Sequence, residues 1–246
     1  MDNKITVGIH QPNYFPWMGF FFKIYASDFF VLHDNVEFTK KSFTKRVHIR
    51  KNQILHEKTY LSVPLKMHSD YTKIKDLEID HREDWQKKHL DKIYNAYSRC
   101  SFFETYFKEL RTFFEQQTKE IRFLSELNTA AIRLCCFWLE MNTNLILSSE
   151  LPVSGKKTGY NINLVKHFNG QIYISGVGAR KYQSEEFTIE NIQLKYHNIY
   201  SFLESQPYPT IDGHFINGLS LIDAIMNIGA EGINDIFRNY LMILNK

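Results

Sequence analysis

The sequence predicts an α/β protein with a Rossmann-like, mainly parallel sheet, a β-hairpin and a helical insertion. Short apolar, β-favouring segments at 5–9 and 29–33 flank a helix-like segment, which is the order of a parallel crossover. A second strand–helix–strand pattern spans 144–175. Between the two units, apolar residues recur at about every second position over 44–63 and at helical spacing over 82–141.

The first unit begins with the segment 5–9, which is typical of a short buried strand. Pro16 suits the first turn of a helix, where the missing backbone N–H costs nothing. We expect this helix to run to about Ala26, and the segment 29–33 to form a parallel neighbour of the first strand. The loop that starts at His10 then follows a strand carboxyl end.

The middle of the chain predicts a hairpin and then helices. Alternation over 44–63, with a turn near Lys51 and Asn52, favours an antiparallel hairpin closed by Pro64. The segment 82–141 is nearly free of Gly and Pro and favours about three amphipathic helices. Further strands are expected near 145–148, 172–175 and 192–196, and further helices near 161–168, 219–228 and 233–244.

These elements fit one domain over 1–246, with the helices at about 82–141 as an insertion. The chain has 30 Lys and Arg against 27 Asp and Glu, a net charge of +3 that is too small for a long nucleic-acid footprint. We therefore expect no DNA partner. The three cysteines lack zinc-site spacing and suit a reducing cytoplasm, so no bound metal or prosthetic group is expected. No run approaches the ~20 apolar residues of a membrane span, and no membrane insertion is expected.

The segment 9–17, IHQPNYFPW, is the first candidate site. Ligands of parallel sheets bind beside strand carboxyl ends, where this loop lies. His10 is a candidate general base, and Gln11 and Asn13 both donate and accept hydrogen bonds. Tyr14 and Trp17 offer flat surfaces for a base or a sugar ring. The alternative is that these groups only hydrogen-bond their own loop.

A second candidate follows the strand 29–33. Asp34 lies where it could share a crevice with His10. Arg46, with His48 and Arg50 on the same face of the hairpin, is a candidate phosphate ligand. The alternative is a solvated edge ribbon whose lysines oppose aggregation.

Two glycine-containing turns complete the candidates. SGKKTGYN at 154–161 places Lys156 and Thr158 at the start of a helix, where free amides attract phosphate. The spacing of a P-loop is absent. SGVGARKY at 175–182 is a strand-to-helix turn, in which Gly176 and Gly178 permit close approach of a ligand to the backbone. The binding candidates in this second turn are Gly176, Gly178, Arg180 and Tyr182.

Taken together, these motifs resemble the WbqC-like protein family of bacteria. The matching pieces are IHQPNYFPWMGFFFKI, the region of Asp34 and Arg46, VPL at 63–65, GKKTGYNINLV, YISGVGARKY and FINGLSLIDAIMNIG. The resemblance implies an association with O-antigen and other surface polysaccharides and with amino-sugar decoration. The layout is also similar to class I nucleotidyltransferase folds, but the segment 17–20 lacks the histidines of their His-x-Gly-His signature.

The leading hypothesis is a cytoplasmic transferase that moves an acyl or aminoacyl group onto the amine of a nucleotide-linked amino sugar. His10 would take the amine proton and Asp34 would orient His10. Gln11, Asn13 and Tyr182 would bind the sugar or base, and Arg46, Lys156, Thr158 and Arg180 the diphosphate. No cysteine lies near these motifs, so direct transfer from the donor or its carrier is expected.

Two other hypotheses remain open from the sequence. The first is a non-catalytic module that binds nucleotide sugars or partner enzymes in a polysaccharide assembly. The second is a nucleotidyltransferase or ATP-dependent ligase, which needs a metal and ATP. The sequence is also compatible with a homodimer.

Overall fold

The computed structural model describes residues 4–54, 56–180 and 184–245. Five strands form the central sheet: β1 (Thr6–His10), β2 (Phe29–Leu32), β5 (Asn144–Leu147), β6 (Ile172–Gly176) and β7 (Gln193–His197). All four pairings are parallel. The predicted parallel sheet is confirmed.

The strand order is β5-β2-β1-β6-β7. The chain therefore moves outward from β1 through β2 to β5, and then returns to the other side of β1 with β6 and β7. The order reverses between β1 and β6. In open α/β sheets this reversal, the topological switch point, opens a crevice at the strand carboxyl ends.

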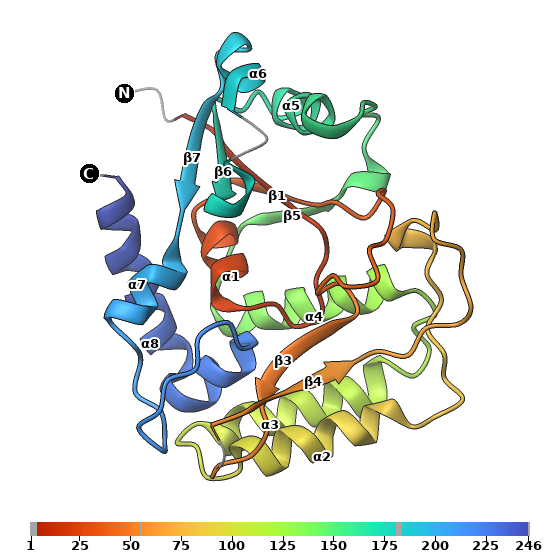
Figure 1. Cartoon of the computed structure of the whole chain (residues 1–246), viewed down its shortest axis with the longest axis vertical. Helices are drawn as coiled ribbons and strands as arrows, with labels where there is room; N and C mark the ends of the chain where they lie inside the picture. The colour runs from red at the N-terminus through yellow and green to blue at the C-terminus, as the bar shows by residue number, and fades with distance from the viewer. Residues whose placement is uncertain (1–3, 55, 181–183, 246) are drawn as a thin grey trace.

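Helices cover both faces of the sheet (Figure 1). α5 (Lys157–His167) and α6 (Ser184–Ile189) pack on one face, where Val7, Ile9 and Tyr173 share a core with Val165 of α5. α1 (Met18–Tyr25) packs on the other face against β1 and β6, and α8 (Leu221–Leu244) lies against α1. Because side chains alternate along a strand, His10 and Gly8 face α1 while Val7 and Ile9 face α5.

The hairpin and the helical insertion form a second layer of structure below the sheet in Figure 1. β3 (Arg46–Arg50) and β4 (Lys58–Ser62) pair antiparallel, as predicted. α2 (Trp85–Tyr97), α3 (Phe103–Thr112) with a π-helical turn η2 (Phe113–Gln117), and α4 (Leu124–Trp138) form the insertion. Asn128 of α4 is fully buried and donates 2.7 Å hydrogen bonds to the carbonyls of Pro12 and Thr44, which ties the insertion to the first loop and the hairpin.

Short helices complete the connections. They are the 3-10 turns η1 (Ile74–Asp76), η3 (Ser148–Glu150) and η4 (Val177–Ala179), and the helix α7 (Ile199–Ser205). η3, η4 and α7 follow the carboxyl ends of β5, β6 and β7, so these turns line the same edge of the sheet as the loop after β1.

One boundary differs from the expectations. Pro16 precedes α1 instead of lying in its first turn, because Trp17 is the extended N-cap residue and pairs with Ser220. The two helices predicted at the C-terminal end are both present within α8, one on each side of a kink at Gly229, whose φ of 67° and ψ of −178° are not helical. Within the described residues, no helix has the length and apolar character needed to span a bilayer.

Candidate functional site

A cavity of about 530 Å³ lies at the switch point, at the carboxyl ends of β1, β6 and β7. The N-terminal part of α1 and the start of α7 close its sides. The cavity is lined mainly by apolar groups, with a few polar side chains that converge on it, which is the usual composition of a small-molecule site. Its lining includes His10, Gln11, Trp17, Gly19, Phe20, Lys23, Ser175, Gly176, Gly178, His197 and Tyr200.

His10 is the last residue of β1, and its side chain faces α1. Its Nδ1 lies 3.0 Å from the carbonyl oxygen of Gln11. A carbonyl only accepts, so Nδ1 carries the proton and Nε2 carries a lone pair. The ring lies edge-on to Trp17 and Phe20, with centroid distances of 5.8 and 5.1 Å. Burial, helped by the charge of Lys23, lowers the pKa of His10 to about 3. His10 is therefore a neutral imidazole at pH 7.

Two further bases lie in the cavity. Lys23 of α1 is 4% exposed, and its Nζ donates a 2.9 Å hydrogen bond to the carbonyl of Ile9. Burial lowers the pKa of Lys23 to about 7. His197 ends β7 and is 7% exposed; burial, with Lys23 adding to the effect, lowers its pKa to about 3. The buried Nδ1 of His197 has no hydrogen-bond partner among the described residues.

The cavity is therefore rich in bases and poor in acids. Its described lining holds His10, Lys23 and His197 but no Asp or Glu. The cost of burying a positive charge is met here by loss of the proton instead of by an ion pair. A negatively charged ligand would supply the missing counter-charge and raise the pKa of each of these groups. This pattern favours an anionic ligand.

The glycine turn after β6 forms the wall opposite α1. A Cβ on Gly176 would lie 3.9 Å from Nε2 of His197, and a Cβ on Gly178 would meet nothing within 4 Å. The backbone of η4 is thus open to the cavity at both glycines. Arg180 follows η4, is exposed, and lies with its guanidinium carbon 5.7 Å from the Tyr196 ring. Arg180 is not among the residues that line the cavity.

Aromatic side chains form the outer part of the cavity. The rings of Trp17 and Tyr200 are stacked, with centroids 6.3 Å apart and an interplanar angle of 25°. Both residues line the cavity. Gln11 lies beside them and offers an amide. A flat apolar surface with one amide suits a sugar ring or a base.

Asp34 lies at the other half of the carboxyl edge. It is 1% exposed, and its Oδ1 accepts 2.9 Å hydrogen bonds from Ser148 Oγ and the Ser149 backbone N–H. Its Oδ2 accepts a 2.6 Å bond from Ser149 Oγ. These bonds fasten the end of β2 to the start of η3. The Asp34 carboxylate thus bonds the two serines, while the ring N–H of His10 bonds the Gln11 carbonyl.

The other residues that were predicted to bind the substrate lie in several parts of the molecule. Tyr14 is fully buried and hydrogen-bonds Nδ1 of His89 at 2.9 Å, and Asn13 is 4% exposed. Arg46 lies on β3, where it donates to the Lys41 carbonyl and stacks 4.8 Å from the Tyr60 ring. Arg50, which follows Arg46 on β3, is 1% exposed and pairs with the carboxylates of Asp212 and Asp223.

Lys156 and Thr158 begin α5, which follows β5. Strands β2 and β1 separate β5 from β6, so the two glycine-containing turns do not follow neighbouring strands. Tyr160 of α5 stacks near His33, which follows β2, with ring centroids 4.9 Å apart. This contact places the N-terminal part of α5 toward the β2 side of the switch point. Tyr182 lies outside the described residues.

The sequence reasoning overlooked Lys23, His197 and Tyr200. Lys23 had a visible signal, since it is the one charged residue within the otherwise apolar α1. His197 and Tyr200 follow the last strand of the sheet, and that position alone would have made them candidates.

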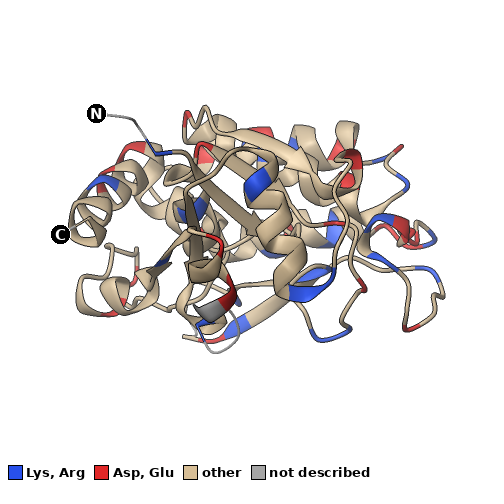
Figure 2. Ribbon diagram, turned by 90° about the horizontal axis from the view of Figure 1, so that it is seen from above, with Lys and Arg blue, Asp and Glu red and all other residues tan. Residues whose placement is uncertain are grey.

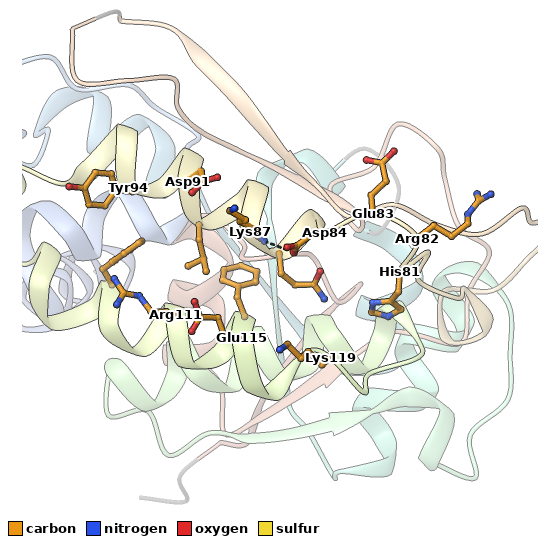
Figure 3. Close-up of a pocket in the computed structure, with 14 residues that line it drawn as sticks. His81, Arg82, Glu83, Asp84, Lys87, Asp91, Tyr94, Arg111, Glu115 and Lys119 are labelled. Atoms are coloured by element: carbon orange, nitrogen blue, oxygen red, sulfur yellow. Dashed lines mark hydrogen bonds between the residues drawn. The ribbon is translucent and has the colours of Figure 1, made fainter.

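A larger hollow, of about 810 Å³, lies between α2 and α3 (Figure 3). Its rim carries both signs of charge, with Lys87 and Asp91 on α2 opposite Arg111 on α3. The Asp84 carboxylate already caps the Lys87 backbone N–H. Over the whole chain, Figure 2 likewise shows acidic and basic residues interspersed. We favour the smaller cavity because buried, unpaired bases converge only there among the described pockets.

The structure is an α/β protein of Rossmann-like topology with a cavity at the switch point. The model of the WbqC-like protein family matches residues 11–235, and the chain belongs to this family. It is 29% identical over 235 residues to the "Uncharacterized protein Rv1507c" of Mycobacterium tuberculosis, with 92% of this chain and 94% of that protein covered. No solved structure matches the chain.

Proposed function

We propose that the chain is a cytoplasmic N-acyltransferase or N-aminoacyltransferase that acts on the amine of a nucleotide-linked amino sugar in surface-polysaccharide synthesis. The observation that supports the proposal most is the neutral imidazole of His10, with a bare Nε2, in a cavity that lacks acids. The resemblance of the sequence motifs to proteins associated with amino-sugar decoration supplies the substrate class.

In the proposed step the sugar amine attacks the carbonyl carbon of an acyl or aminoacyl ester or thioester. The C–N bond forms, and the bond from the carbonyl carbon to the carrier oxygen or sulfur breaks. His10 Nε2 takes the proton that the amine loses and returns it to the leaving group. The anionic substrate raises the pKa of His10 from its low value, because an opposite charge favours the imidazolium. Substrate binding thus makes the imidazole of His10 a stronger base.

The diphosphate in this proposal lies at the turn formed by Gly176 and Gly178, within reach of Arg180. Open backbone N–H groups in such a turn bind phosphate oxygens. Lys23 and His197 provide the positive charge at depth once the anion is bound. Lys156 and Thr158 would serve a second, more distant part of the ligand. Gln11 and Trp17 contact the sugar or base.

The direct test is an assay of amide formation with UDP-glucosamine, which carries a free amine, and a panel of acyl and aminoacyl thioesters and esters. We expect an N-acyl product detectable by mass spectrometry. His10→Ala should lower kcat by ~10²–10⁴-fold. The control is His68→Ala, a histidine remote from the cavity.

Three other results would redirect the proposal. Binding of the sugar nucleotide without turnover, unaffected by His10→Ala, favours a binding module. Product formation only with ATP and Mg²⁺ favours a ligase or nucleotidyltransferase. Activity equal in wild type and His10→Ala would reject His10 as the base.

A further inference from the structure

A cluster of two histidines and one aspartate lies far from the switch-point cavity, where the hairpin meets the loop between α7 and α8. His56 belongs to the turn between β3 and β4, and Asp212 and His214 belong to that loop. One ligand atom from each of the three side chains lies within 4.8 Å of the other two. The imidazoles of His56 and His214 are stacked with centroids 3.7 Å apart. Segments more than 150 residues apart in sequence thus bring metal-ligating groups together.

Hydrogen bonds around the cluster leave its ligand atoms available. Nδ1 of His214 lies 2.9 Å from the Asp212 carbonyl oxygen, which can only accept. The proton therefore sits on Nδ1 and the lone pair on Nε2 of His214. In metal sites, a ligating histidine commonly donates its other ring N–H to a carbonyl in this way.

The carboxylate of Asp212 is fixed from both sides. Its Oδ1 accepts bonds from Thr210 Oγ1 at 2.9 Å and from the His214 backbone N–H at 3.1 Å. Its Oδ2 accepts a 2.6 Å bond from Arg50 and lies 3.5 Å from His56 Nδ1. Oδ1 already accepts two bonds, but Oδ2 has a second lone-pair direction on the side of His56, and hydrogen-bonded carboxylates are common metal ligands.

The charge balance behind the cluster also favours a cation. Arg50 is 1% exposed and pairs with two carboxylates, Asp212 and Asp223. One positive and two negative formal charges leave a deficit of one positive charge. The Tyr208 hydroxyl donates to Asp223 but adds no charge. A cation on the open side of Asp212 would offset this excess of negative charge.

We propose that His56, Asp212 and His214 bind one divalent transition-metal ion of the zinc class. Two imidazole nitrogens and a carboxylate oxygen are typical ligands of Zn²⁺, and a fourth position is left for water or a further ligand. The ion would clip the hairpin turn to the loop that leads into α8. Lys58 of the hairpin already donates a 2.6 Å bond to the carbonyl of Asn217 in this loop.

The test uses the full chain after chelator treatment and dialysis. Titration with ZnCl₂ against a chromophoric chelator should give one site per chain, and CoCl₂ should produce visible absorption bands of a low-coordinate Co²⁺ complex. The thermal midpoint should rise with added Zn²⁺, because the ion binds the folded chain in preference to the unfolded one.

His56→Ala and His214→Ala should each weaken Zn²⁺ binding by at least tenfold and abolish the Co²⁺ bands. Both side chains are exposed, so the fold should persist, and circular dichroism checks this. His167→Ala, an exposed histidine on α5, is the matched control and should bind as wild type. The proposal is overturned if wild type binds neither ion in the titration, or if both variants retain the wild-type affinity.

Discussion

Arg50 and Lys23 are both buried, but the protein accommodates their positive charges differently. Arg50, on β3, is 1% exposed and is bonded to Asp212, Asp223 and the His214 carbonyl. Lys23, on α1, is 4% exposed and its Nζ donates to the Ile9 carbonyl. Arginine stays charged when buried, so it needs the carboxylates. Lysine sheds its proton, and burial lowers the pKa of Lys23 to about 7.

The difference distinguishes a structural centre from the candidate binding site. The positive charge of Arg50 has its counter-charges within the chain, and the cluster joins the hairpin to the start of α8. The Lys23 cavity is left without a carboxylate in its described lining and has His10 and His197 beside it. Unbalanced, titratable groups in a cavity are characteristic of functional sites. A negatively charged ligand would supply the counter-charge that the described lining of this cavity does not provide.

The largest expected effect is on the structural centre. Arg50→Met should lower the free energy of unfolding by ~3–5 kcal/mol, since it leaves the fully buried carboxylate of Asp223 and the partly buried carboxylate of Asp212 without their cation. Urea denaturation followed by circular dichroism measures the loss. Arg46→Met on the same strand is the control and should cost much less, because Arg46 pairs with no carboxylate in the described structure. Equal, small losses in both variants would remove the contrast between the two cations.

Lys23 should have a smaller effect on the free energy of unfolding, and this effect should depend on pH. Its pKa is lowered from 10.5 to about 7, so between these values the unfolded chain holds a proton that the folded chain lacks. The contribution of Lys23 therefore makes stability rise with pH across this window, by ~1.4 kcal/mol per unit. Below pH 7 its destabilisation is fully present.

Lys23→Met should remove this dependence and stabilise the protein near pH 7. Unfolding free energies at pH 7, 8 and 9, compared with those of Lys87→Met on exposed α2, measure it. A variant with the same pH slope as wild type would show that Lys23 is charged in the folded chain, and would contradict the account of the cavity.

The fold could be predicted from sequence because its signals are local. The apolar segments 5–9 and 29–33, the alternation over 44–63 and the helical spacing over 82–141 each follow from nearby residues. Gly229 shows the limit. The helix-like patterns on both sides of it predict the two helices, but they do not show that the break adopts φ 67° with the Phe102 ring packed where a Cβ would lie.

The site was predictable only in part. His10, Gln11, Trp17, Gly176 and Gly178 follow strands that the pattern identifies, and they meet in the cavity. Asp34 also follows such a strand, but which neighbour it contacts depends on strand order. β5 lies beside β2, so Ser148 and Ser149 take its carboxylate. Strand order is a long-range property, and no short motif encodes it.

The smallest expected effect concerns the two glycine-containing turns. Arg180→Ala should weaken binding of UDP-glucosamine by up to about fivefold, since an exposed ion pair contributes up to about 1 kcal/mol. Lys156→Ala should weaken it less, because its turn begins on the far side of β1 and β2 from β6. Both losses should shrink at high salt. Calorimetric titrations check the order, and a larger loss for Lys156→Ala would move the phosphate site to α5.

The central claim is that the bases of the switch-point cavity receive their counter-charge from an anionic ligand. Calorimetric titration with UDP-glucosamine at pH 7.5, in two buffers of different ionisation enthalpy, measures protons taken up on binding. We predict net uptake by the wild type, because the bound anion raises the pKa of Lys23 from about 7, and clearly less uptake by Lys23→Met. Binding without proton uptake, or uptake unchanged in Lys23→Met, would contradict the claim.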